Sequence, residues 1–150
     1  GSKVVLLVRD FRDVYRSVLA FNSRRGFNAF GREAVANDVD YIDALARSAS
    51  ALMAVAKEDG IELIKYEDIA TRPEETLSGF LETLGLEALP SNLDLMVAAL
   101  NKDTPESKRH RTAGSAEQSV GRWKKETSAA EIARFQQHLK PALEFFGYSL

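Results

Sequence analysis

An arginine and a serine near the N-terminus have the types and spacing to bind a phosphate group. Arg9 directly follows the apolar run Val4–Val8, and Ser17 lies eight residues further along the chain. A guanidinium is always charged and matches a phosphate in a bidentate way. If the intervening residues are helical, Ser17 lies roughly 12 Å along the helix axis from Arg9, so one phosphate beside the first turns could contact both. An ion pair between Arg9 and a carboxylate such as Asp13 is the alternative role.

The elements that must position these side chains follow from the local pattern. A short apolar run bounded by charge is typical of a buried parallel strand, here residues 3–9, and residues 11–24 continue with helical spacing. In open α/β sheets, ligands bind beyond the carboxyl ends of the strands, which is where Arg9 stands. The pattern thus predicts a strand, then a phosphate-binding turn, then a helix.

The rest of the chain predicts a helix-rich α/β protein with few parallel strands. Residues 61–66 alternate as a second strand, and the separation of about fifty residues favours parallel pairing through helices. Apolar spacing predicts one long helix or two in tandem over 33–58, and helices over 91–100 and 128–146, the last capped by Ser128 with Glu131 and bent at Pro141. A capping box of Thr71 and Glu74 predicts the start of another helix, and the polar segment 101–121 is expected to be a mobile surface loop.

Three segments resemble, in order, the sulfotransferases that use 3′-phosphoadenosine 5′-phosphosulfate (PAPS). The pattern Arg-Asp-x-x-Asp-x-x-x-Ser after the first strand resembles their 3′-phosphate-binding segment. Residues 64–69, Ile-Lys-Tyr-Glu-Asp-Ile, with the following Arg-Pro-Glu-Glu-Thr-Leu at 72–77, resemble a second family segment. Residues 120–125, Val-Gly-Arg-Trp-Lys-Lys, with Gly-Tyr at 147–148, resemble the C-terminal one. Together the matches span nearly the whole chain.

The resemblance implies a P-loop-like three-layer α/β/α fold and transfer of a sulfuryl group from PAPS to a hydroxyl or amine, leaving 3′-phosphoadenosine 5′-phosphate (PAP). Arg9 and Ser17 would hold the 3′-phosphate, and Tyr66 would contact the adenine or its ribose. The acceptor would be a small molecule, a peptide or a carbohydrate. No metal is required, and the resemblance assigns no catalytic base in this chain. An ordinary core tyrosine is the alternative for Tyr66.

A basic segment before Trp123 supplies further candidates. One branch of the family carries Arg-Lys-Gly at a position that here holds Ala-Glu-Gln, residues 116–118. The contact to the 3′-phosphate is therefore expected from the loop at 107–111. The candidates are Ser107, Lys108, Arg109 and Arg111, with Arg122 beside Trp123. Trp123 itself is expected to be structural, His110 a solvated loop histidine, and Arg12 and Arg16 solvent-facing.

Charge is strongly segregated along a chain whose net charge is only −2. Residues 1–32 carry a net charge of +5 and residues 101–125 carry +4, whereas residues 33–100 carry −10. The two basic segments are the ones that hold the candidate phosphate-binding residues. If they meet in the fold, they form a local anion site; if they do not, they are simply solvated basic surfaces.

Composition narrows the class of protein. The 150 residues suffice for one hydrophobic core, and the absence of cysteine excludes disulfides and thiolate metal sites. No run approaches the ~20 apolar residues of a membrane span, and no nucleic-acid-binding motif is present. We expect a cytoplasmic protein that binds neither nucleic acid nor a metal.

No segment resembles the phosphosulfate-binding loop that this family places on a strand-loop-helix unit. Residues 1–150 are therefore expected to form a single, partial sulfotransferase domain, its C-terminal portion. An incomplete sheet would expose an apolar flank through which two copies could associate. The main alternative is a non-catalytic fragment or degenerate relative that binds the nucleotide. A P-loop kinase and a helical interaction protein without a small ligand are further alternatives.

Overall fold

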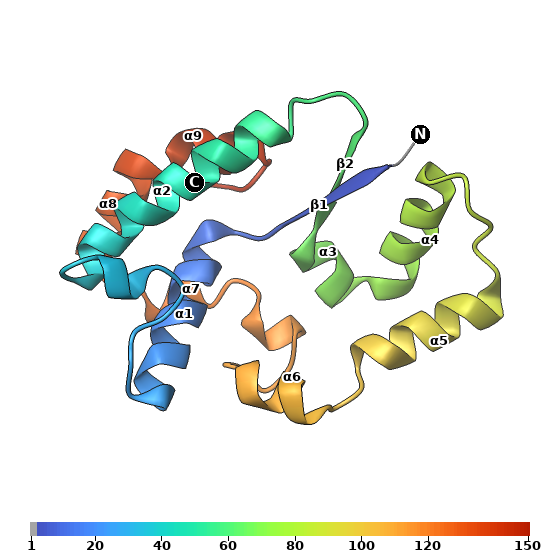
Figure 1. The fold of residues 1–150 in the computed structure, drawn as a ribbon, viewed down its shortest axis with the longest axis horizontal. Helices are drawn as coiled ribbons and strands as arrows, with labels where there is room; N and C mark the ends of the chain where they lie inside the picture. The colour runs from blue at the N-terminus through green and yellow to red at the C-terminus, as the bar shows by residue number, and fades with distance from the viewer. Residues whose placement is uncertain (1–2) are drawn as a thin grey trace.

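The computed structural model describes residues 3–150, apart from the side chain of Glu106. It is a helix-rich α/β structure with one small parallel sheet (Figure 1). The elements in chain order are β1 (Val4–Val8), α1 (Phe11–Arg25), the 3-10 turn η1 (Arg32–Ala34), α2 (Asp38–Val55), β2 (Ile61–Lys65), α3 (Tyr66–Thr71), α4 (Pro73–Thr83), α5 (Pro90–Leu100), α6 (Pro105–His110), the 3-10 turn η2 (Glu117–Ser119), α7 (Trp123–Glu126), α8 (Ala129–His138) and α9 (Lys140–Phe145).

The sheet confirms the predicted parallel pairing. β1 and β2 pair in register from Val4 with Ile61 to Val8 with Lys65, and the crossover between them runs through α1 and α2. Both strands therefore end at the same edge, where α1 and α3 begin. Several strand side chains are exposed, among them Val4, Leu7 and Leu63. This is the apolar flank that the sequence predicts for an incomplete sheet; self-association through it stays a prediction.

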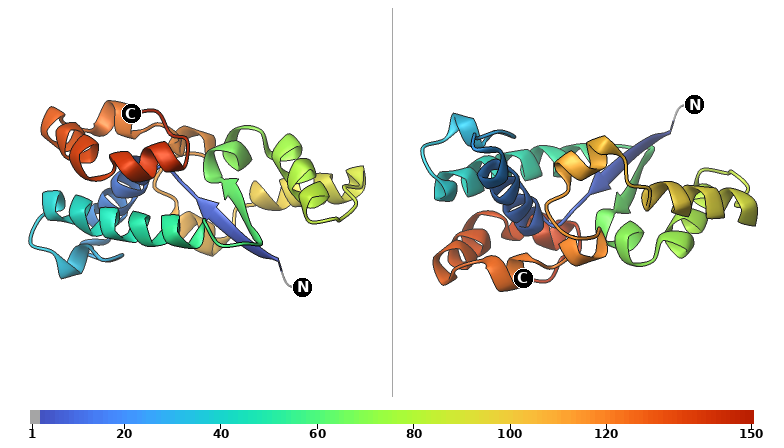
Figure 2. Two further views of the ribbon diagram at one scale, coloured as in Figure 1. Left: turned by 90° about the horizontal axis from the view of Figure 1, so that it is seen from above. Right: turned by 90° about the horizontal axis from the view of Figure 1, so that it is seen from below.

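The hydrophobic core lies to one side of the sheet, where α1 packs with α2, α8 and α9. Figure 2 shows these helices gathered at one end of the molecule, with α4 and α5 at the other and the sheet between them. The core is built from aromatic and aliphatic side chains of all four helices together with the end of β1: Val8, Phe11, Tyr15, Val18, Tyr41, Ile42, Leu45, Ala49, Phe135, Leu139, Ala142, Leu143 and Phe146. Burial of such side chains fixes α1, and with it the residues at the ends of the strands.

The ends of the helices can be compared with the capping residues and breaks that the sequence predicts. The side chain of Asp10 accepts a hydrogen bond from the amide of Arg12 at 3.0 Å and caps α1. The predicted capping box of Ser128 and Glu131 is present at the start of α8. The last helix, predicted as one helix bent at Pro141, is divided into two: α8 ends at His138 and α9 begins at Lys140, with Pro141 in its first turn.

Three local predictions are corrected. Thr71 does not cap α4: it lies at the end of α3, where its hydroxyl donates to the carbonyl of Glu67 at 2.7 Å. The segment 101–121 is not a continuous loop, since it contains α6 and η2. Arg12 is not solvent-facing, because its side chain is 4% exposed, pairs with Asp10 at 2.7 Å and has its guanidinium 3.7 Å from the ring centroid of Trp123.

Candidate functional site

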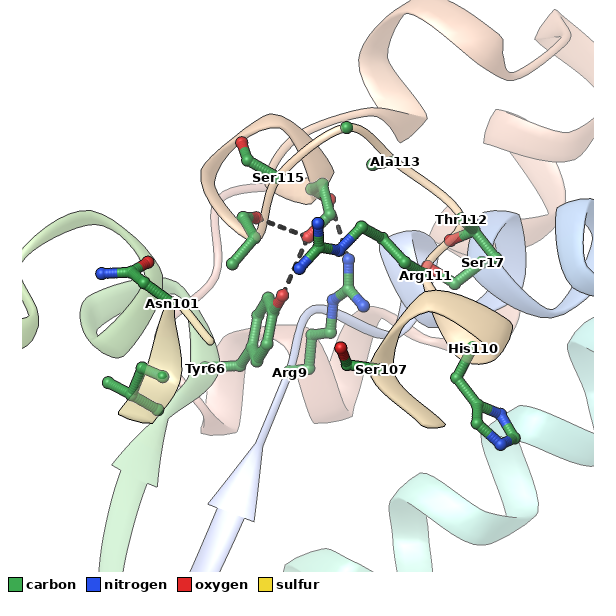
Figure 3. Close-up of a pocket in the computed structure, with 14 residues that line it drawn as sticks. Arg9, Ser17, Tyr66, Asn101, Ser107, His110, Arg111, Thr112, Ala113 and Ser115 are labelled. Atoms are coloured by element: carbon green, nitrogen blue, oxygen red, sulfur yellow. Dashed lines mark hydrogen bonds between the residues drawn. The ribbon is translucent and has the colours of Figure 1, made fainter. Parts of the chain in front are cut away.

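The parallel register places Arg9 and Tyr66 side by side. Each residue directly follows one of the last paired positions, Val8 and Lys65. The guanidinium carbon of Arg9 lies 4.4 Å from the centroid of the Tyr66 ring, and Figure 3 shows the two side chains rising together from the strand ends. The ring face attracts the cation and orients it. The backbone ladder thus sets this pair, which the sequence identified as two separate candidates.

Ser119 of η2 fixes the pair through both its carbonyl and its hydroxyl. Arg9 donates from Nη2 to the carbonyl oxygen of Ser119 at 2.8 Å, and the hydroxyls of Tyr66 and Ser119 share a hydrogen bond at 3.0 Å. Ser119 is buried, so both interactions are shielded from water. Sequence reasoning missed this residue. Its only signal is its place two residues before Gly121, just ahead of the third family-like segment.

Two buried polar atoms beside this pair are left without partners. The Nε of Arg9 and the hydroxyl oxygen of Ser17 are inaccessible and have no hydrogen-bond partner in the part of the chain that the structure describes. Buried donors without partners are costly, and native structures seldom keep them unless a ligand or water satisfies them. Both residues line the same cavity. Two polar atoms without a partner therefore belong to residues that line a space large enough to hold a ligand.

The cavity has a volume of about 390 Å³ and is polar along much of its wall. Figure 3 shows the guanidinium of Arg111 turned towards the same space as that of Arg9. The lining also includes Leu100 and Asn101 on the Tyr66 side, together with Ser107, His110, residues 112–116 and Ser119. The two basic segments thus meet at one site, with Arg9 from one and Arg111 from the other, which is the first of the two alternatives that the charge segregation left open.

Five of the eight candidate binding residues line this cavity: Arg9, Ser17, Tyr66, Ser107 and Arg111. The structure does not bring Lys108, Arg109 or Arg122 into it. Lys108 is exposed and lies 3.7 Å from the carboxylate of Asp103. Arg122 forms a bidentate pair with Glu126 and donates to the carbonyl of Thr112 at 3.1 Å, beside a neighbouring cavity of about 400 Å³.

Ser107 and Arg111 already have partners within their own segment. The hydroxyl of Ser107 completes a capping box with Thr104, which starts α6. Arg111 pairs with the carboxylate of Asp103 at 2.8 Å, leaving the rest of its guanidinium towards the cavity. Ser107 therefore contributes chiefly to the shape of the wall, whereas Arg111 contributes charge.

The loop that carries Ser119 is anchored to α1 by a buried carboxylate. Asp13 accepts hydrogen bonds from the amides of Gly121 at 2.6 Å and Trp123 at 2.9 Å. Gly121 has φ of 72°, a conformation that suits glycine and turns its amide towards Asp13. Burial raises the pKa of Asp13, and the two amide hydrogen bonds oppose that rise. Asp13 thus acts in holding the loop and is not available to bind a ligand.

Glu67 joins the two strand ends from the other side. One of its carboxylate oxygens accepts from the amide of Asp10, and the other accepts from the hydroxyl of Tyr148, both at 2.9 Å. Burial and the Glu67 carboxylate together raise the pKa of Tyr148. Asp68 pairs with a basic residue, Arg72, at 2.8 Å. These carboxylates have structural partners and leave the cavity with a positive lining.

The arrangement has the chemistry that suits an anion, because Arg9, Arg111 and Ser17 line one cavity together with an aromatic ring and an apolar side chain. The family profile described as "Sulfotransferase domain" matches residues 1–147. This chain belongs to the sulfotransferase domain family. No curated protein and no solved structure matches the sequence of this chain.

Two further features of this sulfotransferase chain concern metals and membranes. Within residues 3–150, no group of three or more His, Asp or Glu side chains is arranged to hold a metal ion. Among the helices the structure describes, none is both long enough and apolar enough to cross a membrane.

Proposed function

We propose that this chain supplies the 3′-phosphate and adenosine side of the donor site in a PAPS-dependent sulfotransferase. The observation that carries the proposal is the pair of unpartnered buried atoms, Arg9 Nε and Ser17 Oγ, in two residues that line one cavity together with Arg111. A phosphate monoester offers three acceptor oxygens, which suits this set of donors. Arg111 already has Asp103 as a counter-charge, whereas an uncharged ligand would leave Arg9 without one among the described residues.

Different residues of the cavity are assigned to the two parts of the proposed ligand, the 3′-phosphate and the adenosine. Arg9 uses Nη2 to bond Ser119 and keeps Nε for the 3′-phosphate, with the hydroxyl of Ser17 as the second donor. Arg111 adds charge from the opposite wall. Tyr66 offers the ring face away from Arg9 to the adenosine, next to Leu100 and Asn101 on the same wall. Aromatic stacking and apolar contact favour a flat base in this position.

PAPS supplies the sulfuryl group that passes to a hydroxyl or amine of a small-molecule, peptide or carbohydrate acceptor. The residues of this chain contribute binding and orientation, because the fixed cations neutralise the donor and hold it in one pose. Ser119 and Tyr66 keep Arg9 in place before the ligand arrives, which limits the reorganisation that binding requires. We propose that residues 1–150 form a single, partial domain whose strands belong to a three-layer α/β/α sheet of the P-loop type.

Calorimetric titration of the chain with PAP and with AMP tests the 3′-phosphate site. We expect PAP to bind more tightly, and R9A to lose roughly 1.5–3 kcal/mol of that preference, because a charge-assisted contact is removed. R47A is the matched control: Arg47 is exposed on α2 and makes no hydrogen bond or ion pair within residues 3–150. A preference for PAP that survives R9A unchanged contradicts the proposal.

Incubation with PAPS and a panel of hydroxyl and amine acceptors separates the enzyme from a binding module. Sulfated product assigns the transfer to this chain. Binding of PAP without product favours the alternative, a fragment or relative that retains the nucleotide site and performs no chemistry.

A further inference from the structure

The short helix α6 carries one wall of the cavity and is fastened at its C-terminal end. α6 spans only Pro105–His110, and Arg111 follows it directly. In Figure 1 it lies below the ends of both strands. A six-residue helix has little stability of its own. What holds it therefore decides where Arg111 points.

The strongest attachment comes from Arg24, in the last turn of α1. Its Nη2 donates to the carbonyl of Arg109 and its Nη1 donates to the carbonyl of Arg111, both at 2.6 Å. The last carbonyls of a helix have no partner within the helix and carry its negative dipole end. One guanidinium therefore caps the end of α6 with two charge-assisted hydrogen bonds, across more than eighty residues of sequence.

Two further contacts hold the segment at the C-terminal end of α6. The ring of His110 stacks on Phe21 of α1 with centroids 5.5 Å apart and planes inclined by 4°. Arg122 donates to the carbonyl of Thr112 at 3.1 Å. Residues 109–112 are thus held by α1 on one side and by the loop before α7 on the other.

We infer that Arg24 is a positioning residue of the anion site: it holds the end of α6 so that Arg111 faces Arg9 and Ser17. Arg24 does not line the cavity and touches no part of the proposed ligand. The inference rests on the proposed function, since it concerns binding of the 3′-phosphate. A lysine cannot replace Arg24, because a single ammonium lacks the planar fork that spans two carbonyls.

Binding of PAP and AMP to R24Q and R25Q tests this role. Arg25 is the matched control, because it is the adjacent exposed arginine and R25Q removes the same charge. Its guanidinium carbon lies 5.6 Å from the ring centroid of Phe21, and it donates no hydrogen bond to the described residues, so R25Q removes the charge without releasing α6. We expect R24Q to bind PAP about fivefold more weakly with AMP binding unchanged, and R25Q to stay within about twofold of the wild type. R24K should resemble R24Q. R24Q that binds PAP like the wild type overturns the inference.

A double-mutant cycle with R111A separates positioning from a general loss of structure. If Arg24 acts through Arg111, the R24Q change weakens PAP binding in the wild type and has no further effect in R111A. An equal loss in both backgrounds overturns the inference. Hydrogen–deuterium exchange gives a readout without ligand: the amides of Lys108 and Arg111, which bond to the carbonyls of Thr104 and Ser107, should lose protection in R24Q and keep it in R25Q.

The failures of the two proposals are distinct. Wild-type protein without any preference for PAP over AMP overturns the proposed function, and with it the role of Arg24 towards a ligand. Wild-type protein that prefers PAP, with R24Q unchanged in both binding and exchange, overturns only the inference about Arg24.

Discussion

The two walls of the anion cavity are held by different kinds of contact. The wall formed by β1, α1 and the Ser119 loop rests on buried polar groups, above all the carboxylate of Asp13, which is 1% exposed. The wall formed by α6 is held by exposed arginines that donate to backbone carbonyls, such as Arg24. Buried networks are rigid and costly to break, whereas exposed ones contribute little stability. The first wall is thus part of the folded core, and the second can move without unfolding it.

The largest effect is expected at Asp13, in the buried wall. D13A leaves the amides of Gly121 and Trp123 without an acceptor, so the free energy of unfolding should fall by about 3 kcal/mol. Urea unfolding measures this change. D94A is the control, because Asp94 is exposed on α5 without a hydrogen bond or ion pair in the described chain, and it should change stability by less than about 0.5 kcal/mol. If D13A is as stable as D94A, the two walls do not differ as described.

A smaller and different effect is expected at Arg111, in the α6 wall. R111A removes a partly exposed side chain paired with Asp103, so the free energy of unfolding should change by less than about 0.5 kcal/mol. The same change removes a cation from the cavity and should weaken PAP binding about tenfold. Urea unfolding and calorimetry on the same sample test both statements. A large loss of stability in R111A would show that α6 belongs to the core.

The smallest effect is a pH dependence at Glu126, which orients Arg122 behind the α6 wall. Hydrogen bonds from Arg122 hold the pKa of Glu126 below its ordinary value of 4.5, although partial burial opposes this shift. Its contribution to stability is therefore present above pH 4.5 and is lost as the pH falls through the lowered pKa. Because the pair is partly exposed, we expect less than about 1 kcal/mol.

Urea unfolding of the wild type and E126Q at about pH 6 and about pH 3 measures this contribution. E126Q should lose less stability on acidification than the wild type. E58Q, a change at an exposed glutamate with no partner among the described residues, should behave like the wild type. Parallel curves for the wild type and E126Q would contradict the prediction.

The buried wall was the more predictable of the two from sequence. The apolar run at 4–8, the helix that follows and the parallel partner strand are all local patterns, and the structure confirms them. The burial of Arg12 was not predictable in the same way. Helical spacing assigns a face, but Trp123 covers that face only after residues more than a hundred positions apart have met. The pairing of Arg12 with Asp10 is local and does not by itself bury the side chain.

The α6 wall escaped prediction for a related reason. The segment 101–121 lacks apolar periodicity, so it was interpreted as a loop. α6 exists because Thr104 and Ser107 cap its start and Arg24 caps its end. The capping box at the start of α6 is hard to recognise in the sequence, because it uses serine where the usual box has glutamate or glutamine. The cap at its end cannot be recognised locally, because Arg24 belongs to α1. Ser119 was missed because its role lies as much in its carbonyl as in its side chain.

The strand register has a consequence for how this chain can vary. Arg9 meets Tyr66 because both follow paired positions of one backbone ladder, whose hydrogen bonds do not depend on side-chain identity. Exchange of one apolar residue for another in either strand leaves the meeting point unchanged. A single-residue insertion or deletion within a strand shifts the ladder by about 3.3 Å and turns the following side chain to the opposite face. The site therefore tolerates apolar substitutions in the two strands, whereas an insertion or deletion within either strand should disrupt it.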